Sequence, residues 1–365
     1  MKICFLAGAS SIHTVRWVNA MSERGHDVYL LTIHKPKERI HDRVHVIEMP
    51  VPPPLGYYLN YPFAKKYLEK IKPDILNTHY ASGYGTLSRL LNFHPTLLSV
   101  WGSDIFDFPY QNRWKYKIIV KNLNAATQIA STSMIMKYQV EKFITPKLPI
   151  VITPFGVDTN YFKPTEMKKN NEDIIQIGMV KRLEEIYGPK YLIQAIAILK
   201  SMLIESGKKS LSEKIRLLIV GGGSQYKELR LLSQELGISD IVRFTGSVSH
   251  SDVPKYLSEI DIFCAPSILE SFGVAVIEAS ACGIPVVASN VGGLPEVVRD
   301  NETGFLVEPK NPMKIAEKLY KLVIDEELRK EMGNKGRDFV KRYYDWDDNV
   351  KLMEKVYIDL ISKFS

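Results

Sequence analysis

The chain has 365 residues, of which 45% are hydrophobic and 24% are charged, values typical of globular domains. The chain is longer than an ordinary domain with a single hydrophobic core, and its length suits two domains of about 150–200 residues each. The composition excludes a collagen, a coiled coil or a disordered chain as the main state, and no run of about 18 apolar residues predicts a spanning helix. Three widely spaced cysteines, Cys4, Cys264 and Cys282, argue against a disulfide framework and for a reducing compartment.

The N-terminal segment allows two interpretations. Met1 and Lys2 precede an apolar run from Ile3 to Ala9, which has the outline of a weak signal peptide. The single charge and the minimal apolar run favour a buried first strand instead. We therefore expect a cytoplasmic protein, with peripheral contact to the inner face of a membrane as a further option.

The excess of positive charge lies in the first half. Residues 1–165 hold 20 Lys and Arg against 11 Asp and Glu, whereas residues 166–365 hold 28 against 30. Basic and aromatic residues are interleaved in two segments, 57–72 and 106–121. This mixture suits an anionic membrane surface, and solvated helix faces explain it equally well. Nucleic acid is the least favoured partner, and we expect none.

Apolar runs alternate with helical periods along the first half. The expected strands are Lys2–Leu6, Asp27–Thr32, Val44–Ile47, Ile75–Asn77, Thr96–Val100, Gln128–Ala130 and Ile150–Ile152. Between the first two, Ile12, Val15, Val18 and Met21 recur every third residue and share one helix face, which Gly25 would end. The repetition indicates right-handed βαβ units and a parallel sheet.

A polar stretch, residues 163–173, has the composition of a linker, and a second α/β series follows it. Its expected strands are Ile174–Met179, Ile215–Val220, Val242–Thr245, Ile262–Ala265, Pro285–Ala288 and Gly304–Val307. Helices are expected near 188–204, 225–236, 251–259, 273–282 and 311–323, with two more from Glu327 to Phe364 on either side of Trp346. Two such halves imply a cleft between them that binds ligands.

The most informative segment runs from Pro266 to Ser289. A strand ends, a loop carries Glu270, and a helix begins near Gly273, so that the first free N–H groups make an anion site. Glu278 lies one to two turns further on, where a carboxylate can bind a diol such as ribose, and Glu270 faces the same site. A phosphate between two carboxylates suggests a nucleotide sugar. The alternative without a ligand is that one acidic residue interacts favourably with the helix dipole and the other Glu is solvated.

The Glu-x7-Glu spacing, with Phe-Gly inside it and Gly283-Ile-Pro-Val-Val-Ala-Ser289 after it, resembles the retaining glycosyltransferases of family 4. Phe155-Gly156-Val157-Asp158, Val220-Gly-Gly-Gly223 and Val242–Val248 resemble other segments of that family in the same order. The resemblance implies the α/β GT-B fold, with two Rossmann-like, doubly wound parallel-sheet domains facing a cleft and a final helix crossing back. It places the acceptor domain at 1–165 with about 346–365, and the nucleotide-sugar domain at 166–345.

The resemblance also implies roles for single residues in the second half. Glu278 matches the carboxylate that binds the donor ribose, and Glu270 the one that contacts the donor sugar. Phe272, Gly273 and Val274 match the backbone donors to the diphosphate, Val248 the segment that contacts the base, and Arg182 and Lys190 the pair that neutralises the diphosphate. An Arg and a Lys suit this task without a metal, because the departing nucleoside diphosphate carries negative charge.

The first half departs further from the family. Gly8 permits a tight turn after the first strand, and Ser11 is expected to donate to phosphate, where the family often has Gly-Gly. Trp101 stands where many relatives have a histidine, so that role does not transfer, and the indole suits stacking on a sugar instead. Asp104 is the nearest acidic group, and His79 and His13 are further candidates for acceptor contact, each weighed against a structural role.

No His/Cys set has zinc spacing, and Asp345 and Asp347 are better interpreted as a helix cap than as metal ligands. We therefore expect a metal-independent retaining glycosyltransferase with no cofactor. It would move a sugar from a UDP- or GDP-sugar to a saccharide or lipid-linked acceptor in cell-surface glycan synthesis. The alternatives are a GT-B nucleotide-sugar epimerase or phosphorylase and, disfavoured by the missing glycine at Tyr226, an NAD-dependent Rossmann oxidoreductase.

Overall fold

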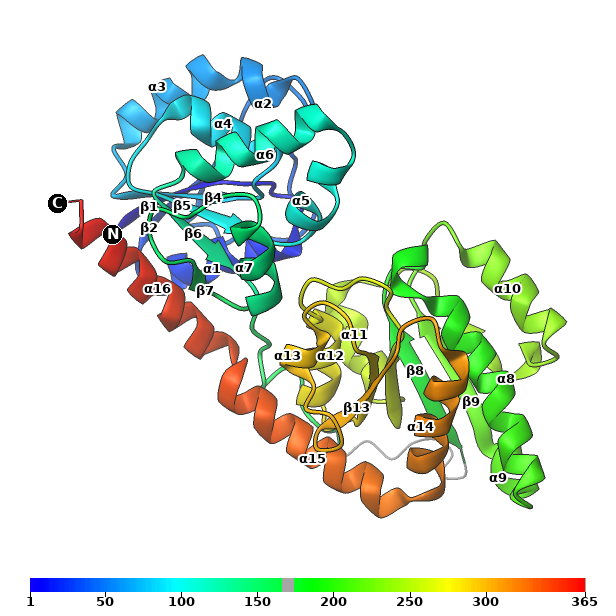
Figure 1. Ribbon diagram of the computed structural model, residues 1–365. Coiled ribbons are helices and arrows are strands. Elements are labelled where there is room, and N and C mark those ends of the chain that lie inside the picture. Colours follow the sequence, from blue (N-terminus) through cyan, green and yellow to red (C-terminus); the bar gives the residue numbers. More distant parts are fainter. Residues whose placement is uncertain (166–173, 365) are drawn as a thin grey trace. The chain divides into compact units, whose positions relative to one another are not determined.

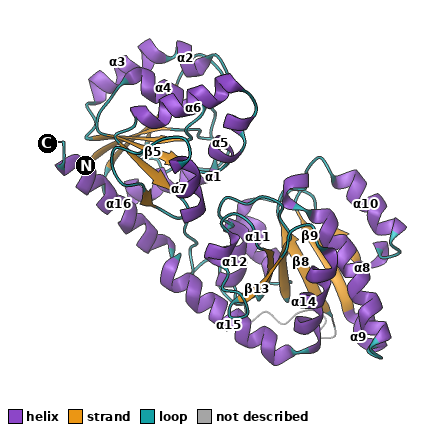
Figure 2. Ribbon diagram, in the orientation of Figure 1, coloured by secondary structure: helices purple, strands orange, loops and turns teal. Residues whose placement is uncertain are grey.

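The structure is a computed structural model that describes residues 1–165 and 174–364. The chain forms two compact units (Figure 1): unit 1 contains Met1–Phe155 and Asp347–Ser365, and unit 2 contains Gly156–Trp346. In each unit a parallel sheet lies between two layers of helices (Figure 2). The division follows Phe155, ahead of the predicted linker at 163–173, of which residues 166–173 lie outside the described part.

Unit 1 is built on a seven-stranded sheet with the order β3-β2-β1-β4-β5-β6-β7. Its strands are β1 Lys2–Leu6, β2 Asp27–Thr32, β3 His45–Glu48, β4 Ile75–His79, β5 Thr96–Val100, β6 Gln128–Ser131 and β7 Val151–Ile152. All neighbours pair in parallel. β4, β5 and β6 are buried along their whole length, as strands covered on both faces must be. The run at residues 2–6 is a buried strand near the middle of this sheet.

The helices of unit 1 cover both faces of its sheet (Figure 1). They are α1 Ile12–Glu23, α2 Gly56–Leu59, α3 Tyr61–Ile71, α4 Gly83–Leu91, α5 Ser103–Phe106, α6 Arg113–Ala125 and α7 Met134–Glu141, with a 3-10 turn at Phe108–Tyr110. The predicted α1 face is confirmed, because Val15, Val18 and Met21 are buried. Gly25 follows the helix with a φ of +86°, as predicted for its end.

The C-terminal helix α16, Trp346–Ser362, begins in unit 2 and packs its remaining length on unit 1. Glu354 on this helix accepts hydrogen bonds from Arg24 Nη2 at 2.5 Å and lies 2.6 Å from His26 Nε2. The buried Tyr357 hydroxyl donates to Asn77 Oδ1 at 2.8 Å. These contacts confirm that the final helix returns to the first unit.

Unit 2 is built on a six-stranded parallel sheet with the order β10-β9-β8-β11-β12-β13. Its strands are β8 Ile175–Val180, β9 Ile215–Val220, β10 Val242–Phe244, β11 Ile262–Ala265, β12 Val286–Ser289 and β13 Gly304–Val307. Its helices are α8 Pro189–Glu205, α9 Lys209–Lys214, α10 Tyr226–Glu235, α11 Val253–Leu257, α12 Val274–Ala281, α13 Leu294–Val297, α14 Pro312–Ile324 and α15 Glu326–Tyr343. Three 3-10 turns lie at Glu185–Tyr187, Ser239–Ile241 and His250–Asp252.

The predicted strands all exist, with ends shifted by no more than two residues. The largest difference among the helices is at 251–259, where the α-helical part is only Val253–Leu257. A 3-10 turn at His250–Asp252 replaces its start, and Pro254 stands in its first turn. Asp345, predicted as a helix cap, accepts a hydrogen bond from the Thr159 hydroxyl at 2.6 Å. Among the described residues, no helix is long and apolar enough to cross a membrane.

Candidate functional site

In unit 2 the strand order reverses between β8 and β11, and the loops after parallel strands at such a point commonly bind ligands. The loop after β8 lies against the loop after β9. The Lys181 amide donates to the Val220 carbonyl at 3.0 Å, and the Leu183 amide to the Gly222 carbonyl at 3.0 Å. A Cβ on Gly221 would lie 2.0 Å from the Lys181 carbonyl oxygen, so the glycine run is required by this close approach.

The loop that carries Glu270 is held on both sides. The Ile268 amide donates to the Ile186 carbonyl at 2.8 Å, and the Gly293 amide donates to the Glu270 carbonyl at 2.9 Å. A Cβ on Gly292 would lie 1.8 Å from the Glu270 carbonyl oxygen. The backbone of Glu270 is therefore fixed by the loop that follows β12, and its side chain direction is largely decided by the fold.

The Glu270 side chain forms an ion pair that sequence analysis missed. Its Oε2 lies 2.6 Å from Lys181 Nζ, and the two side chains are only 10% and 23% exposed. Burial lowers the pKa of the Lys181 ammonium, but the Glu270 carboxylate and Tyr187 outweigh this effect and the pKa is raised. Glu278 raises it further. Lys181 is therefore a charged group within reach of both predicted carboxylates.

The helix α12 begins where the anion site is predicted. Gly273 is its N-terminal cap with a φ of +108°, a conformation that favours glycine, and the Val276 and Ile277 amides both donate to the Gly273 carbonyl. The amides of Val274 and Ala275 come before these and have no acceptor within the helix. Phe272 is buried, with its ring 5.6 Å from that of Tyr344. The helix end thus presents N–H groups directly after the Glu270 loop.

Glu278 lies on α12 and is also paired. Its Oε1 is 2.8 Å from His250 Nε2, and the carboxylate side chain is 6% exposed. His250 stands in the 3-10 turn just after Val248, which is half-buried in the loop that follows β10. A Cβ on Gly222 would lie 2.4 Å from Ser247 Oγ, so this loop also packs on the glycine run. The segment expected to contact the base is therefore tied to the carboxylate expected to bind ribose.

The predicted cationic pair is not assembled around the carboxylates. The Arg182 side chain is 76% exposed, and its Nη2 lies 3.1 Å from Glu184 Oε1. Lys190 is the second residue of α8, with Nζ 3.9 Å from Glu185 Oε1 and 5.2 Å from the Tyr191 ring centre. Both point to partners in their own loop and helix, because successive side chains after β8 point in different directions. Their contact with a diphosphate stays a prediction.

In unit 1 the predicted turn after β1 is present. The Ser11 amide donates to the Gly8 carbonyl at 3.1 Å, and the Ser11 side chain makes no capping hydrogen bond. A Cβ on Gly8 would meet His34 Nδ1 at 3.4 Å. The Tyr84 hydroxyl accepts from the Ile33 amide and lies 2.8 Å from that histidine nitrogen. The loop is thus fixed, and the contact of Gly8 and Ser11 with a diphosphate stays a prediction.

His79 has a structural environment. Its Nε2 lies 3.0 Å from Asn77 Oδ1 and its Nδ1 lies 3.2 Å from Thr14 Oγ1. The side chain is buried, and burial first, then His13, lowers its pKa to about 3. Both ring nitrogens are therefore used inside the fold by a neutral ring, which does not support the acceptor contact expected for His79.

Trp101 and His13 belong to an aromatic cluster. The His13 ring stacks on Phe155 at 4.0 Å, and Trp101 meets both rings edge-on, at 5.9 and 5.4 Å. The Trp101 side chain also lies 4.2 Å from the His79 ring and is only 6% exposed. Packing on protein rings leaves little of the indole to stack on a sugar, so the platform role expected for Trp101 is not supported.

Asp104, the predicted catalytic carboxylate, is enclosed by backbone amides, and its catalytic role stays a prediction. Its Oδ2 accepts from the Ala81 amide at 2.8 Å, and its Oδ1 accepts from the Gly102 amide at 2.8 Å and the Trp101 amide at 3.2 Å. The residue is 1% exposed. Burial raises its pKa, while these amides oppose the rise. Asp104 joins the loops after β4 and β5, and it presents no open face to a substrate.

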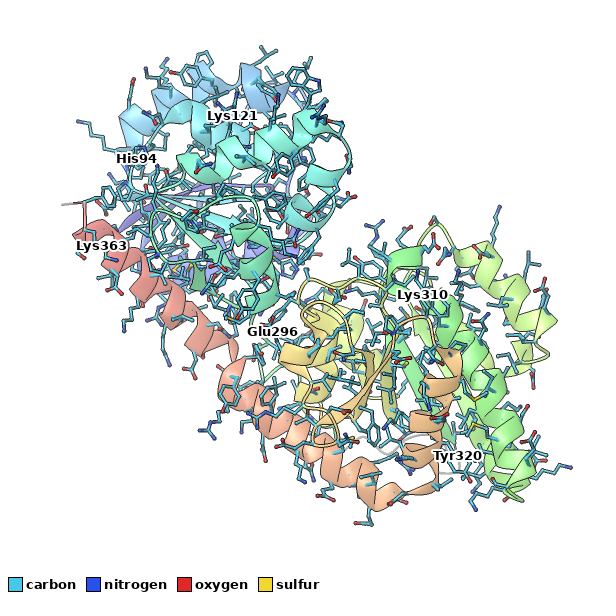
Figure 3. The ribbon with its side chains drawn as sticks, in the orientation of Figure 1. His94, Lys121, Glu296, Lys310, Tyr320 and Lys363 are labelled. Carbon is cyan, nitrogen blue, oxygen red and sulfur yellow. The ribbon has the colours of Figure 1, made fainter. Side chains whose placement is uncertain are left out.

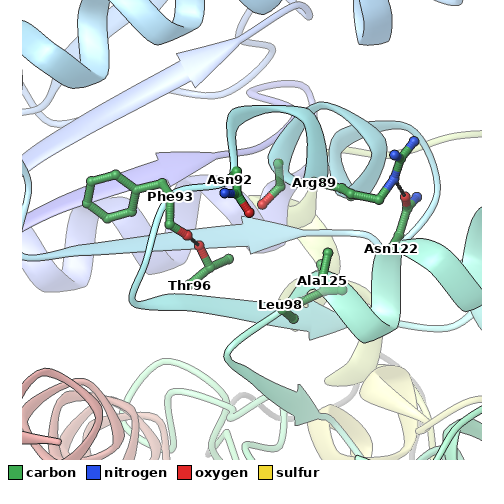
Figure 4. Close-up of a pocket in the computed structure, with 10 residues that line it drawn as sticks. Arg89, Asn92, Phe93, Thr96, Leu98, Asn122 and Ala125 are labelled. Carbon is green, nitrogen blue, oxygen red and sulfur yellow. Dashed lines mark hydrogen bonds between the residues drawn. The ribbon is translucent and has the colours of Figure 1, made fainter. Parts of the chain in front are cut away.

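Two further features of the structure concern metal binding and the size of one pocket in unit 1. Within residues 1–165 and 174–364, no group of His, Cys, Asp and Glu has the arrangement of a metal site. The pocket around Arg89 and Asn122, whose side chains are hydrogen-bonded at 2.9 Å, has a volume of about 10 Å³ (Figure 4). That is room for about one water molecule and not for a sugar.

Comparison with known proteins agrees with this architecture. The family Glycosyl transferases group 1 matches residues 162–339, and Glycosyl transferase 4-like matches residues 2–133. The D-inositol 3-phosphate glycosyltransferase of Corynebacterium jeikeium is 30% identical over 316 residues, covering 80% of this chain and 74% of that protein. A GDP-mannose-dependent alpha-(1-6)-phosphatidylinositol monomannoside mannosyltransferase of Mycobacterium tuberculosis is 31% identical over 216 residues, 55% of this chain and 54% of that one.

Among solved structures, Anabaena Alr3699/HepE in complex with UDP covers 99% of this chain and 100% of that one, with a TM-score of 0.82 and 18% identity. This likeness and the two parallel-sheet units define the GT-B fold. The chain belongs to the group 1 glycosyl transferases.

Proposed function

We propose that the protein is a retaining glycosyltransferase that moves a sugar from a UDP- or GDP-sugar to a saccharide or lipid-linked acceptor in cell-surface glycan synthesis. The observation that carries the proposal is the pair of buried carboxylates at α12, with Glu270 in the loop before the helix and Glu278 in its second turn. In the proposed complex the diphosphate lies at the free amides of Val274 and Ala275. Glu278 then binds the ribose diol and Glu270 the hydroxyls of the transferred sugar.

The proposed chemistry needs no metal and no separate protein base. Negative charge grows on the distal phosphate as the sugar–phosphate bond breaks, and the amides of α12 and nearby cations stabilise it. The acceptor hydroxyl attacks from the side of the leaving group, and the departing phosphate takes its proton. This course fits the enclosed Asp104, because the reaction requires no carboxylate from unit 1.

The names of similar proteins support a nucleotide donor but differ in the base. One relative is called GDP-mannose-dependent, and the Anabaena structure contains UDP. In the proposed complex the segment around Val248 contacts the base through its backbone, so no side chain there indicates which base is bound. Experiments should therefore test both nucleotides. An epimerase, a phosphorylase or an NAD-dependent oxidoreductase is not favoured by any observation in the structure.

Unit 1 is the proposed site of acceptor and membrane contact. On one side of its sheet, α2, α3, α4 and α6 form a layer (Figure 1). Leu55 and Leu59 at α2 are 63% and 59% exposed, and Trp114 on α6 is 76% exposed. Lys117 Nζ lies 5.5 Å from the Trp114 ring centre, and Lys121 stands on the same helix (Figure 3). Exposed apolar side chains beside lysines suit an anionic lipid surface, where a lipid-linked acceptor would reside.

The variant Glu270→Ala tests the proposal. Transfer should fall by about 100-fold or more, the size of an interaction with a charged group that is lost in the transition state. Binding of UDP or GDP, measured by calorimetry, should change little, since that carboxylate contacts the sugar. Nucleoside diphosphate release is measured from UDP-glucose and GDP-mannose with and without a lipid-linked acceptor. Full turnover by the variant, or release that never depends on acceptor, would contradict the proposal.

A further inference from the structure

Lys181 stands at the point where the strand order of unit 2 reverses. It directly follows β8, and Glu270 lies in the loop that follows the neighbouring strand β11. The Lys181 Nζ lies 2.6 Å from Glu270 Oε2 and 4.5 Å from the Tyr187 ring centre. Its charge also interacts with Glu278. One ammonium therefore pairs with the Glu270 carboxylate and is close enough to feel the charge of Glu278, the two carboxylates to which the proposed function assigns the donor.

Binding of a diphosphate at the start of α12 would leave an excess of negative charge there. Glu270 and Glu278 are both nearly buried, and a nucleoside diphosphate brings at least two further negative charges to the first turn of α12. Like charges close together in a poorly solvated site repel strongly, and a buried carboxylate that loses its cation is unfavourable. The site needs a cation that faces the Glu270 carboxylate and the phosphates together.

The other nearby cations are directed elsewhere. Arg182 is mostly exposed and pairs with Glu184, which in turn accepts from the Ser224 hydroxyl. Lys190 pairs loosely with Glu185 at 3.9 Å. His250 contacts Glu278 and not Glu270. Within the described part of the chain, Lys181 is the cation recorded in contact with Glu270.

We propose that Lys181 is a positioning residue of the donor site, which holds Glu270 in place and compensates its charge so that a nucleoside diphosphate can bind beside it. The proposal rests on the proposed function, since it takes the donor to bind at α12. It predicts that the need for Lys181 in nucleotide binding comes from the Glu270 carboxylate. Removing that carboxylate should therefore remove most of the need for the lysine.

The test is a double-mutant cycle followed by calorimetry with UDP and with GDP. Lys181→Met should weaken binding of the nucleotide that the wild type prefers by about 10- to 100-fold, the range for losing a charged partner. Lys181→Arg should keep most of the affinity, because it restores a cation. The double variant, Lys181→Met with Glu270→Gln, should bind within a few-fold of the wild type and still fail to transfer sugar.

Lys314→Met is the matched control, because Lys314 forms a 2.8 Å pair with Glu317 on the surface of α14 and lies outside the site. Its affinity should equal that of the wild type. Thermal unfolding of each variant shows whether the fold is kept. Unchanged binding in Lys181→Met, or a folded double variant as weak as Lys181→Met, overturns the role of Lys181 alone. If the folded wild type binds neither UDP nor GDP, the proposed function fails with it.

Discussion

The two units place different chemistry at the same topological position. In unit 2 the strand order reverses between β8 and β11, and there Lys181 faces Glu270 from one loop to the next. In unit 1 it reverses between β1 and β4, and the loop after β4 is held by Asp104 through the Ala81 amide. The Glu270 carboxylate is paired with a lysine side chain, which can rotate to another partner. The Asp104 carboxylate is hydrogen-bonded to backbone amides, which are held in place by the fold. The difference separates a carboxylate paired with a charged side chain from one held by a fixed framework of amides.

The same contrast holds for the histidines. His250 pairs with Glu278 and its side chain is 32% exposed, whereas His79 is buried with both nitrogens bonded inside unit 1. The His250 ring therefore keeps some access to solvent. A group that supports the fold has its hydrogen-bonding capacity filled by the protein. Polar residues at strand ends therefore have to be judged by their partners, not by their type.

The largest effect expected within unit 1 is on stability, from Asp104→Asn. The amide keeps one acceptor oxygen but turns a donor toward a backbone amide, which should lower the free energy of unfolding by about 2–3 kcal/mol. Denaturant unfolding measures this, with the exposed Asp107→Asn as the control. Nucleotide binding should be unchanged. A variant with normal stability and no transfer would instead restore Asp104 as a catalytic residue.

The pH dependence of that difference has a definite sign. Burial raises the pKa of Asp104 in the folded state, despite the amides that oppose the rise. The folded chain therefore holds this proton more tightly than the unfolded chain, and the contribution of Asp104 improves as the pH falls through the raised pKa. Because asparagine does not titrate, the stability gap between wild type and Asp104→Asn should widen from pH 7 toward pH 4.

Sequence analysis recovered the strands and helices of both units, because those depend on patterns with a clear period, and the resemblance to family 4 implied that the final helix crosses back. It predicted Arg182 and Lys190 as contacts of the diphosphate, which stay predictions, and it did not predict the contact of Lys181 with Glu270. Lys181 and Arg182 both follow the end of β8, and their side chains have different partners because of how the loops around them pack. Sequence alone does not show which of these two side chains faces Glu270.

The environment of Asp104 in unit 1 was not predicted, for a different reason. Asp104 follows a strand and has the chemical type of a catalytic acid, and both facts were visible in the sequence. What was not visible is that three backbone amides converge on it, since this depends on how two loops fold against each other. His250 was missed for a similar reason. Its place in a short 3-10 turn is set by packing on the glycine run and not by local propensity.

A smaller effect is expected at Glu278, where two variants separate the carboxylate from its partner. Glu278→Gln should weaken UDP or GDP binding by about 10-fold, because a neutral amide replaces the charged acceptor of the ribose diol. His250→Gln should cost only a few-fold, since the new amide nitrogen can still donate to Glu278. Calorimetry gives both values. A larger loss for His250→Gln than for Glu278→Gln would mean that the histidine itself contacts the nucleotide.

The smallest effect concerns the exposed surface of unit 1. It tests whether that surface binds lipid. Trp114→Ala removes a side chain that is 76% exposed and makes no contribution to the core. Binding to vesicles that contain phosphatidylglycerol should weaken by about 3- to 10-fold, or about 1 kcal/mol, and binding to phosphatidylcholine vesicles should be weak for both proteins. Leu231→Ala, at a position 59% exposed in unit 2, is the control and should leave co-sedimentation unchanged. Equal losses in the two variants would show that exposed apolar area, rather than the basic aromatic surface of unit 1, determines lipid contact.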